Sequence, residues 1–101
     1  MIIGGKAEDL EEYIHLHANV SETVLDRIAK SNIVNYSIFH RQLDGGEHVL
    51  FSYYEYIANN YDQDLARIAN DPATQEWWDL CGPMQIPLQS RQDGEWWANM
   101  T

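Results

Sequence analysis

Tyr13 and His17 are two residues of this chain that could do acid–base chemistry together. They lie four positions apart in a stretch with helical periodicity, so their side chains share one helix face and can touch. The ordinary pKa of histidine, about 6.5, lets an imidazole both give and take a proton near neutrality. A tyrosine beside it can orient a hydroxyl group or relay a proton. The pair indicates proton exchange with a small polar ligand; the simpler interpretation is a helix face that packs in the core.

Three more aromatic residues are candidates for the wall of a ligand pocket. Tyr36 lies in a strand that the helix carrying His17 is expected to cover or flank. Trp77 and Trp78 are adjacent on a later helix, where neighbouring side chains point about 100° apart. One indole could therefore face the core and the other a cavity, where its ring could stack on the C–H groups of a sugar. Simple packing is the alternative for all three residues.

The sequence holds no motif for a metal ion, a nucleotide or a hydrolase nucleophile. His15 and His17 are two positions apart on a helix and do not face each other, and no Cys/His pair has the spacing of a zinc site. Neither a basic cluster nor a glycine-rich loop before a helix is present to bind phosphate. We therefore expect no metal and no cofactor.

The charge balance narrows the choice of partner further. The chain has 16 acidic against 6 basic residues and a net charge of -10, so its surface repels nucleic acid and anionic membranes. No apolar run approaches the roughly 20 residues of a membrane span. A neutral ligand such as an uncharged monosaccharide fits this charge better than a phosphorylated one.

The length of 101 residues predicts a single domain over 1–101. Cys81 is the only cysteine, so an internal disulfide is excluded and the thiol is expected to be a small buried apolar group. The first residues lack the charged start and long apolar stretch of a signal peptide, so a cytoplasmic location is expected.

Hydrophobic periodicity predicts the elements that must position these residues. Met1 to Gly4 is a short apolar run that favours a strand. From Ala7 to about Ser31, apolar residues recur every three or four positions, which predicts one helix with 19–21 as the place for a bend. From Val34 to Arg41 the period changes to two, which is typical of a strand with Val34 and Tyr36 on one face.

The second half of the chain continues this alternation of strand and helix. Asp44-Gly45-Gly46 predicts a tight turn, after which Val49 to Tyr56 pairs back as a hairpin strand. Tyr61 to Ala69 has a helical pattern. Asp71 can cap a further helix with Pro72 in its first position, and that helix is expected to stop at Gly82-Pro83.

The order strand, helix, strand, strand, helix predicts an α+β fold of the ferredoxin-like, split βαβ type, with helices on one face of an antiparallel sheet. The fourth strand is not evident: Pro87–Gln92 or Trp96–Met100 could supply it, a partner subunit could supply it, or it is missing. The uncovered face of so aromatic a sheet is expected to form a pocket, a dimer interface, or both.

The ordered motifs of the chain resemble those of the L-rhamnose mutarotase family over most of its length. The stretch around Trp77-Trp78 is the most distinctive. The matching segments are Glu12-Tyr13 with His17-Ala18, Asn35–Phe39, Leu50–Tyr56, Asp71–Trp78 and Gly94–Trp97.

The resemblance implies a homodimer of ferredoxin-like protomers, the dimeric α+β barrel type. It implies an isomerase, an aldose 1-epimerase or mutarotase of rhamnose metabolism that interconverts the α and β anomers of a free monosaccharide. It gives His17 the role of proton donor, and it places the sugar against Tyr13, Tyr36, Trp77 and Trp78.

The choice of sugar and two rival functions stay open. An aromatic pocket would favour the methyl group of a 6-deoxy sugar such as L-rhamnose or L-fucose. The chain has Val20-Ser21-Glu22 where family members commonly have a Pro-containing segment, so the sequence does not choose between these sugars. The rivals are a cofactor-independent monooxygenase on the dimeric α+β barrel fold and a non-catalytic sugar-binding module.

Overall fold

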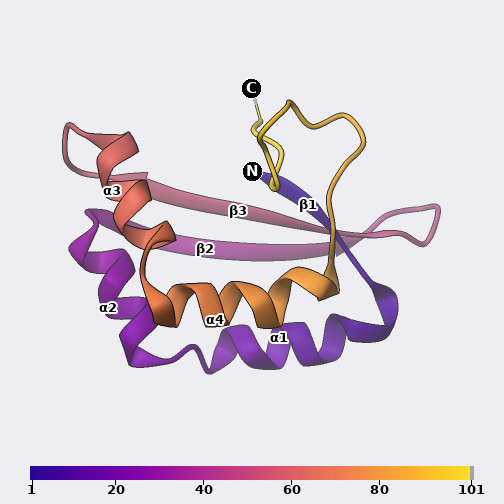
Figure 1. The fold of residues 1–101 in the computed structure, drawn as a ribbon. Coiled ribbons are helices and arrows are strands. Elements are labelled where there is room, and N and C mark those ends of the chain that lie inside the picture. Colours follow the sequence, from indigo (N-terminus) through magenta and orange to yellow (C-terminus); the bar gives the residue numbers. More distant parts are fainter. Residues whose placement is uncertain (101) are drawn as a thin grey trace.

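The structure, a computed structural model that describes residues 1–100, has four helices packed on one side of a four-stranded antiparallel sheet (Figure 1). The strands are β1 (Ile2–Gly5), β2 (Ile33–Gln42), β3 (His48–Tyr56) and β4 (Gln85–Ile86). Their order in the sheet is β2-β3-β1-β4, and every neighbouring pair is antiparallel. This arrangement is the ferredoxin-like plan, so the predicted fold class is confirmed.

The first predicted helix is divided into two. α1 (Leu10–Ala18) follows a short 3-10 turn at Ala7–Asp9, and α2 (Glu22–Lys30) begins after a break. The side chain of Ser21 accepts a hydrogen bond from the backbone N–H of Val24, which starts a new helix there. The prediction of one bent helix was therefore wrong in its continuity and right about the position of the disturbance.

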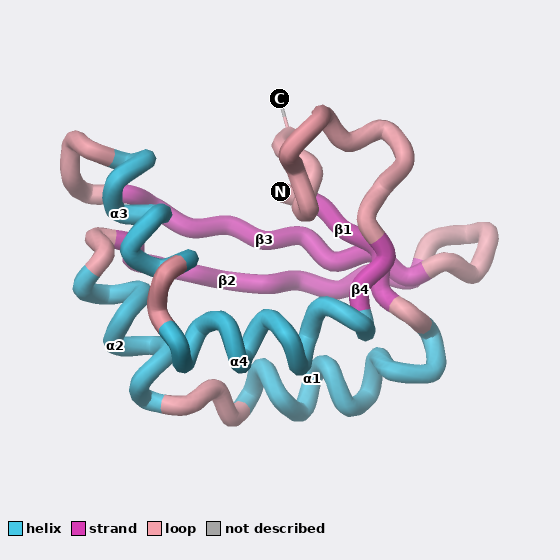
Figure 2. The backbone as a smooth tube through the Cα atoms, in the orientation of Figure 1, coloured by secondary structure: helices cyan, strands magenta, loops and turns pink. Residues whose placement is uncertain are grey.

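The two later helices agree with the sequence prediction. α3 (Tyr61–Ala69) and α4 (Pro72–Cys81) are separated by two residues. The Asp71 carboxylate accepts hydrogen bonds from both the backbone N–H and the hydroxyl of Thr74, at 2.9 and 2.8 Å. Pro72 occupies the first turn, and α4 ends before a 3-10 turn at Gly82–Met84. Figure 2 shows α1 and α4 on the same side of the strands.

The β2–β3 hairpin contains an irregularity that decides where Tyr36 points. Val34 pairs with Glu55 but Ser37 pairs with Tyr53, so β2 has one extra residue there. Asn35 adopts a positive φ of 53° within this bulge. Regular alternation would place Val34 and Tyr36 on one face, and that expectation was wrong. The bulge turns Tyr36 toward the helix side, where its ring stacks on Tyr54.

The fourth strand lies earlier than either stretch proposed for it. β4 consists of only Gln85 and Ile86, which pair with Gly5 and Gly4. A Cβ on Gly4 would lie 2.7 Å from the carbonyl oxygen of Ile86, so this close pairing requires glycine. Two residues are too few to show strand periodicity, which explains why the sequence did not reveal the strand.

The rest of this sheet edge is filled by the C-terminal segment. Ala98 pairs with Ile2 through two backbone hydrogen bonds of 2.8 Å. Of the two stretches considered, Trp96–Met100 thus supplies one isolated bridge, and Pro87–Gln92 supplies no strand. Residues 87–97 leave the sheet as a loop between these two pairings, and this loop carries Trp96 and Trp97.

The core lies between the sheet and the helices. Its buried members include Cys81, as predicted, and Tyr13, which is 2% exposed. The core residues are Ile3, Leu10, Tyr13, Leu50 and Cys81, with Ile38, Trp77, Met84 and Trp97 packed against them. On the opposite face of the sheet, Phe39 and Tyr53 remain 61% and 54% exposed. The protein therefore has one closed face and one open apolar face.

Candidate active site

Tyr13 and His17 meet as their spacing on α1 predicts. Their rings stack with centroids 4.1 Å apart and an angle of 23° between the ring planes. The Nδ1 atom of His17 lies 2.8 Å from the backbone carbonyl oxygen of Tyr13. Since a carbonyl oxygen can only accept, Nδ1 donates this hydrogen bond and carries a proton. In the neutral ring, Nε2 is then the nitrogen with the free lone pair.

The surroundings of His17 favour the neutral imidazole. The side chain is half-buried, and this burial lowers its pKa from the ordinary value, since it disfavours the charged form. The hydrogen bond to the Tyr13 carbonyl raises the pKa and opposes part of that effect. Near neutral pH the ring is therefore mainly uncharged and can accept a proton at Nε2.

Trp77 forms the second wall beside His17. Its indole reaches from α4 and meets the imidazole edge-on, with centroids 5.0 Å apart and an angle of 60° between the planes. Trp77 is partly buried against the core cluster, so packing holds its ring in place. The structure thus brings Tyr13, His17 and Trp77 from two separate helices into one aromatic cluster.

Tyr36 approaches the cluster from the sheet. Its ring is stacked on Tyr54 with a centroid separation of 5.4 Å, and the residue is 43% exposed. Burial of the phenol end raises the pKa of Tyr36, and repulsion from Tyr61 raises it further. Among residues 1–100, the ring of Tyr36 therefore pairs with Tyr54 and makes no ring contact with Tyr13, His17 or Trp77.

Trp78, like Tyr36, is a predicted site residue whose ring does not join the Tyr13–His17–Trp77 cluster. It is 49% exposed on α4, and among residues 1–100 it makes no ring-to-ring contact with Tyr13, His17 or Tyr36. The pair Trp77-Trp78 is therefore divided as adjacent helix positions predict: one indole packs inward and the other faces outward.

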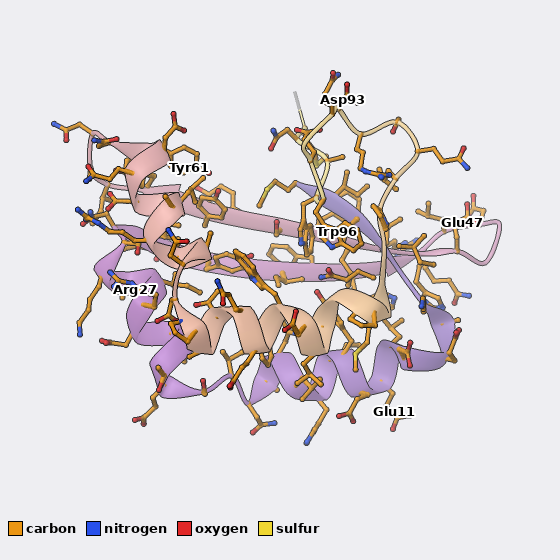
Figure 3. All side chains as sticks on the ribbon, viewed as in Figure 1. Glu11, Arg27, Glu47, Tyr61, Asp93 and Trp96 are labelled. Carbon is orange, nitrogen blue, oxygen red and sulfur yellow. The ribbon has the colours of Figure 1, made fainter. Side chains whose placement is uncertain are left out.

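Two further residues, Gln85 and Trp96, extend the cluster through side-chain hydrogen bonds. The Gln85 side chain donates a hydrogen bond from Nε2 to the hydroxyl oxygen of Tyr13 at 2.8 Å. Trp96, labelled in Figure 3, donates from its indole Nε1 to Oε1 of Gln85 at 2.7 Å. Trp96 lies in the Gly94–Trp97 segment that carries the family resemblance but was given no role in the site, whereas nothing in the sequence pointed to Gln85.

Tyr13 keeps its proton throughout the neutral range. Burial raises its pKa to about 12, and the hydrogen bond from Gln85 opposes that rise. A phenol with so high a pKa donates or accepts hydrogen bonds but does not act as a base near pH 7. Of the two stacked rings, only the imidazole of His17 can take up a proton under these conditions.

Two hollows in the surface lie away from the cluster. One, of about 440 Å³, lies at the α3–α4 junction and is lined by residues that include Arg27 and Arg67; Figure 3 labels Arg27 at that end of the molecule. The other, of about 600 Å³, lies along the α2 residues from Glu22 to Ala29. None of the five predicted site residues lines either hollow. Neither hollow therefore gives a ligand access to His17.

The part of the chain that the structure describes, residues 1–100, contains no group of three or more His, Cys, Asp or Glu side chains placed to hold a metal ion. Within the same residues, no helix is both long and apolar enough to cross a membrane.

The fold and the cluster define a class: a ferredoxin-like α+β protein with an imidazole between a phenol and an indole, a site suited to acid–base chemistry on a small polar ligand. The chain belongs to the L-rhamnose mutarotase family, whose model matches residues 2–101. The family is one of mutarotases, which are isomerases, so the resemblance is confirmed. No individually curated protein matches the chain.

Proposed function

We propose that this protein interconverts the α and β anomers of a free 6-deoxy sugar, with L-rhamnose as the first choice and L-fucose as the second. The observation that carries the proposal is the position of His17, held between Tyr13 and Trp77 with its Nδ1 proton already committed to a backbone carbonyl. That arrangement leaves Nε2 as the nitrogen that exchanges protons with a ligand.

Mutarotation needs two proton movements that this site can supply. The anomeric hydroxyl loses its proton while the ring oxygen gains one, the bond between C1 and the ring oxygen breaks, and C1 becomes an aldehyde. After rotation about the C1–C2 bond, the hydroxyl group formed from the ring oxygen attacks the other face of the C1 aldehyde, and both proton movements reverse. No electron leaves or enters the sugar. General acid–base catalysis contributes roughly 10²–10⁴-fold in such steps.

In this proposal His17 is the catalytic residue. Its neutral Nε2 takes the proton of the anomeric hydroxyl, and the resulting imidazolium returns a proton to the ring oxygen as the ring opens; closure runs the same two transfers in reverse, so His17 ends each half neutral. The hydrogen bond from Nδ1 to the Tyr13 carbonyl stabilises the imidazolium, because a charged donor makes the stronger hydrogen bond. The proton donor that the family resemblance assigns to His17 is this imidazolium.

The aromatic residues around His17 are proposed to hold the sugar. Tyr13 and Tyr36 present hydroxyl groups to its polar edge, and Trp77 and Trp78 present ring faces to its C–H groups and methyl group. Because Tyr13 is 2% exposed, this proposal requires the side chains that cover its hydroxyl group to shift when the sugar binds. The half-exposed positions of Tyr36 and Trp78 support this assignment, since both rings are accessible to a ligand.

We also propose that the protein is a homodimer that pairs through the open face of the sheet. Phe39 and Tyr53 are exposed there, and the neighbouring Phe51 pairs directly with Phe39. The helices cover only the other face (Figure 2). A second copy of the same apolar face would remove these rings from water, as expected for a symmetric interface.

Saturation-transfer NMR between the anomeric protons of several free sugars tests the proposed activity. We expect faster exchange for L-rhamnose or L-fucose than in buffer, and a much smaller effect on hexoses that carry a hydroxymethyl group. Binding of the sugar without faster exchange would instead identify a sugar-binding module. No acceleration with any sugar would contradict the proposal.

A further inference from the structure

The side chains of Trp96, Gln85 and Tyr13 form a chain of hydrogen bonds whose direction is fixed. An indole N–H can only donate, so Oε1 of Gln85 must be the atom that faces Trp96. The amide nitrogen of Gln85 therefore faces Tyr13 and donates to its hydroxyl oxygen. This settles the orientation of the amide group by chemistry, because the reversed amide would place two donors against each other.

The direction of these two hydrogen bonds determines what the Tyr13 hydroxyl group can donate or accept. Because its oxygen accepts from Gln85, its own proton is free to be donated to another group. Among residues 1–100, the structure assigns that proton no acceptor. The ring is stacked on His17, so an acceptor near the free side of the hydroxyl would lie close to the imidazole as well.

We infer that Gln85 and Trp96 are positioning residues that make Tyr13 a hydrogen-bond donor to an oxygen of the sugar. The inference rests on the proposed mutarotase function and adds two residues to it. A donor beside a proton-accepting imidazole is what ring opening requires, because the ring oxygen becomes more basic as the C–O bond breaks. Trp96 acts from the C-terminal loop and Gln85 from β4, so both act through Tyr13.

The substitution Gln85→Glu tests the direction of the hydrogen bonds with little change in shape. One carboxylate oxygen can still accept from Trp96, but the other can no longer donate and instead accepts the Tyr13 proton. We expect kcat/KM for anomer exchange to fall at least about tenfold at pH 7, mainly in kcat, the size expected when one hydrogen bond is lost. Gln89→Glu, an equal charge change at an exposed position in the loop that follows β4, should leave kcat/KM within about twofold of the wild-type value.

The pH dependence of the Gln85→Glu variant distinguishes a positioning role of Gln85 from a purely structural one. A protonated glutamic acid can donate to Tyr13 as glutamine does, and its ordinary pKa is about 4.3. The ratio of Gln85→Glu to wild-type activity should therefore rise between pH 7 and pH 5, with the titration of His17 common to both proteins. Trp96→Phe removes the donor that orients the amide and should give a smaller loss, roughly three- to tenfold.

Equal kcat/KM for Gln85→Glu and wild type, or a ratio that does not change with pH, would overturn the inference. If the wild-type protein does not speed anomer exchange at all, the proposed function fails. The hydrogen bonds among Trp96, Gln85 and Tyr13 are then tested by NMR measurement of solvent exchange alone. The Trp96 indole N–H should exchange slowly with solvent in the wild type and rapidly in Gln85→Met. Unchanged exchange in Gln85→Met would overturn the inference independently of activity.

Discussion

His17 donates a hydrogen bond from Nδ1 to the backbone carbonyl of Tyr13, 2.8 Å away and one helical turn earlier. The same two residues stack their rings, so a single i, i+4 relationship on α1 fixes both the tautomer and the plane of the imidazole. The carbonyl is otherwise part of the helix backbone, which makes it a rigid acceptor. The free nitrogen of the ring is thereby directed away from the helix.

The pH dependence of activity follows from the environment of His17. Burial lowers its pKa from the ordinary value of 6.5, so the neutral base persists at a lower pH than it would in water. We expect kcat/KM to fall on acidification with a midpoint below pH 6.5, after subtraction of the spontaneous rate. Histidine ring NMR on the same samples would assign the midpoint to His17. A midpoint above 6.5 would contradict the described environment.

Trp77 and Trp78 should respond differently to truncation. Trp77→Ala opens a cavity beside the core cluster and removes the wall that meets His17, so we expect a loss of about 2–4 kcal/mol in unfolding free energy together with reduced activity. Trp78→Ala, at a half-exposed position, should cost less than about 1 kcal/mol and act mainly on KM. Urea unfolding and anomer-exchange kinetics measure both. Equal stability losses would contradict the separation of the two indoles.

The cap of α4 offers a prediction on stability alone. Asp71→Ala removes the acceptor for the backbone N–H and hydroxyl of Thr74, whose side chain is buried. We expect a loss of about 1–2 kcal/mol in unfolding free energy, the usual cost of an N-cap. Asp79→Ala, an exposed position on the same helix, serves as the control and should be nearly neutral. A loss no larger than that of the control would contradict the role of the cap.

The sheet face supplies a prediction on assembly. Phe39→Lys places a charge on the open apolar face and should convert the proposed dimer to a monomer of 11.7 kDa in sedimentation experiments. Leu25→Lys, at a 52% exposed position on α2, should leave the dimer intact. A wild-type protein that stays monomeric at high concentration would contradict the proposed interface.

Local patterns predicted the larger elements well. The change from helical to alternating periodicity located the hairpin, and Asp71-Pro72 located the start of α4, because cap and proline preferences act within a few residues. The i, i+4 rule brought Tyr13 to His17 for the same reason. These relationships need no knowledge of the rest of the chain.

The features that the sequence did not reveal depend on contacts between distant segments. The bulge at Asn35 breaks the alternation of β2 and turns Tyr36 toward the helix side of the sheet. The residue types in this segment do not predict the bulge. The two-residue β4 exists because it pairs with Gly4 and Gly5. Gln85 reaches Tyr13 across 72 positions of the chain, so its role becomes visible only when β4 is placed at the sheet edge.

The catalytic role of His17 is tested most directly by the rate of L-rhamnose anomer exchange. This rate is compared among wild type, His17→Gln and His15→Gln. His15 lies on the same helix and is exposed, so the control repeats the substitution outside the cluster. We predict acceleration by the wild type and by His15→Gln, and at least about a hundredfold loss for His17→Gln in a folded protein, the lower end of what acid–base catalysis supplies. An exchange rate equal to that of the wild type in the His17→Gln variant would contradict the catalytic role of His17.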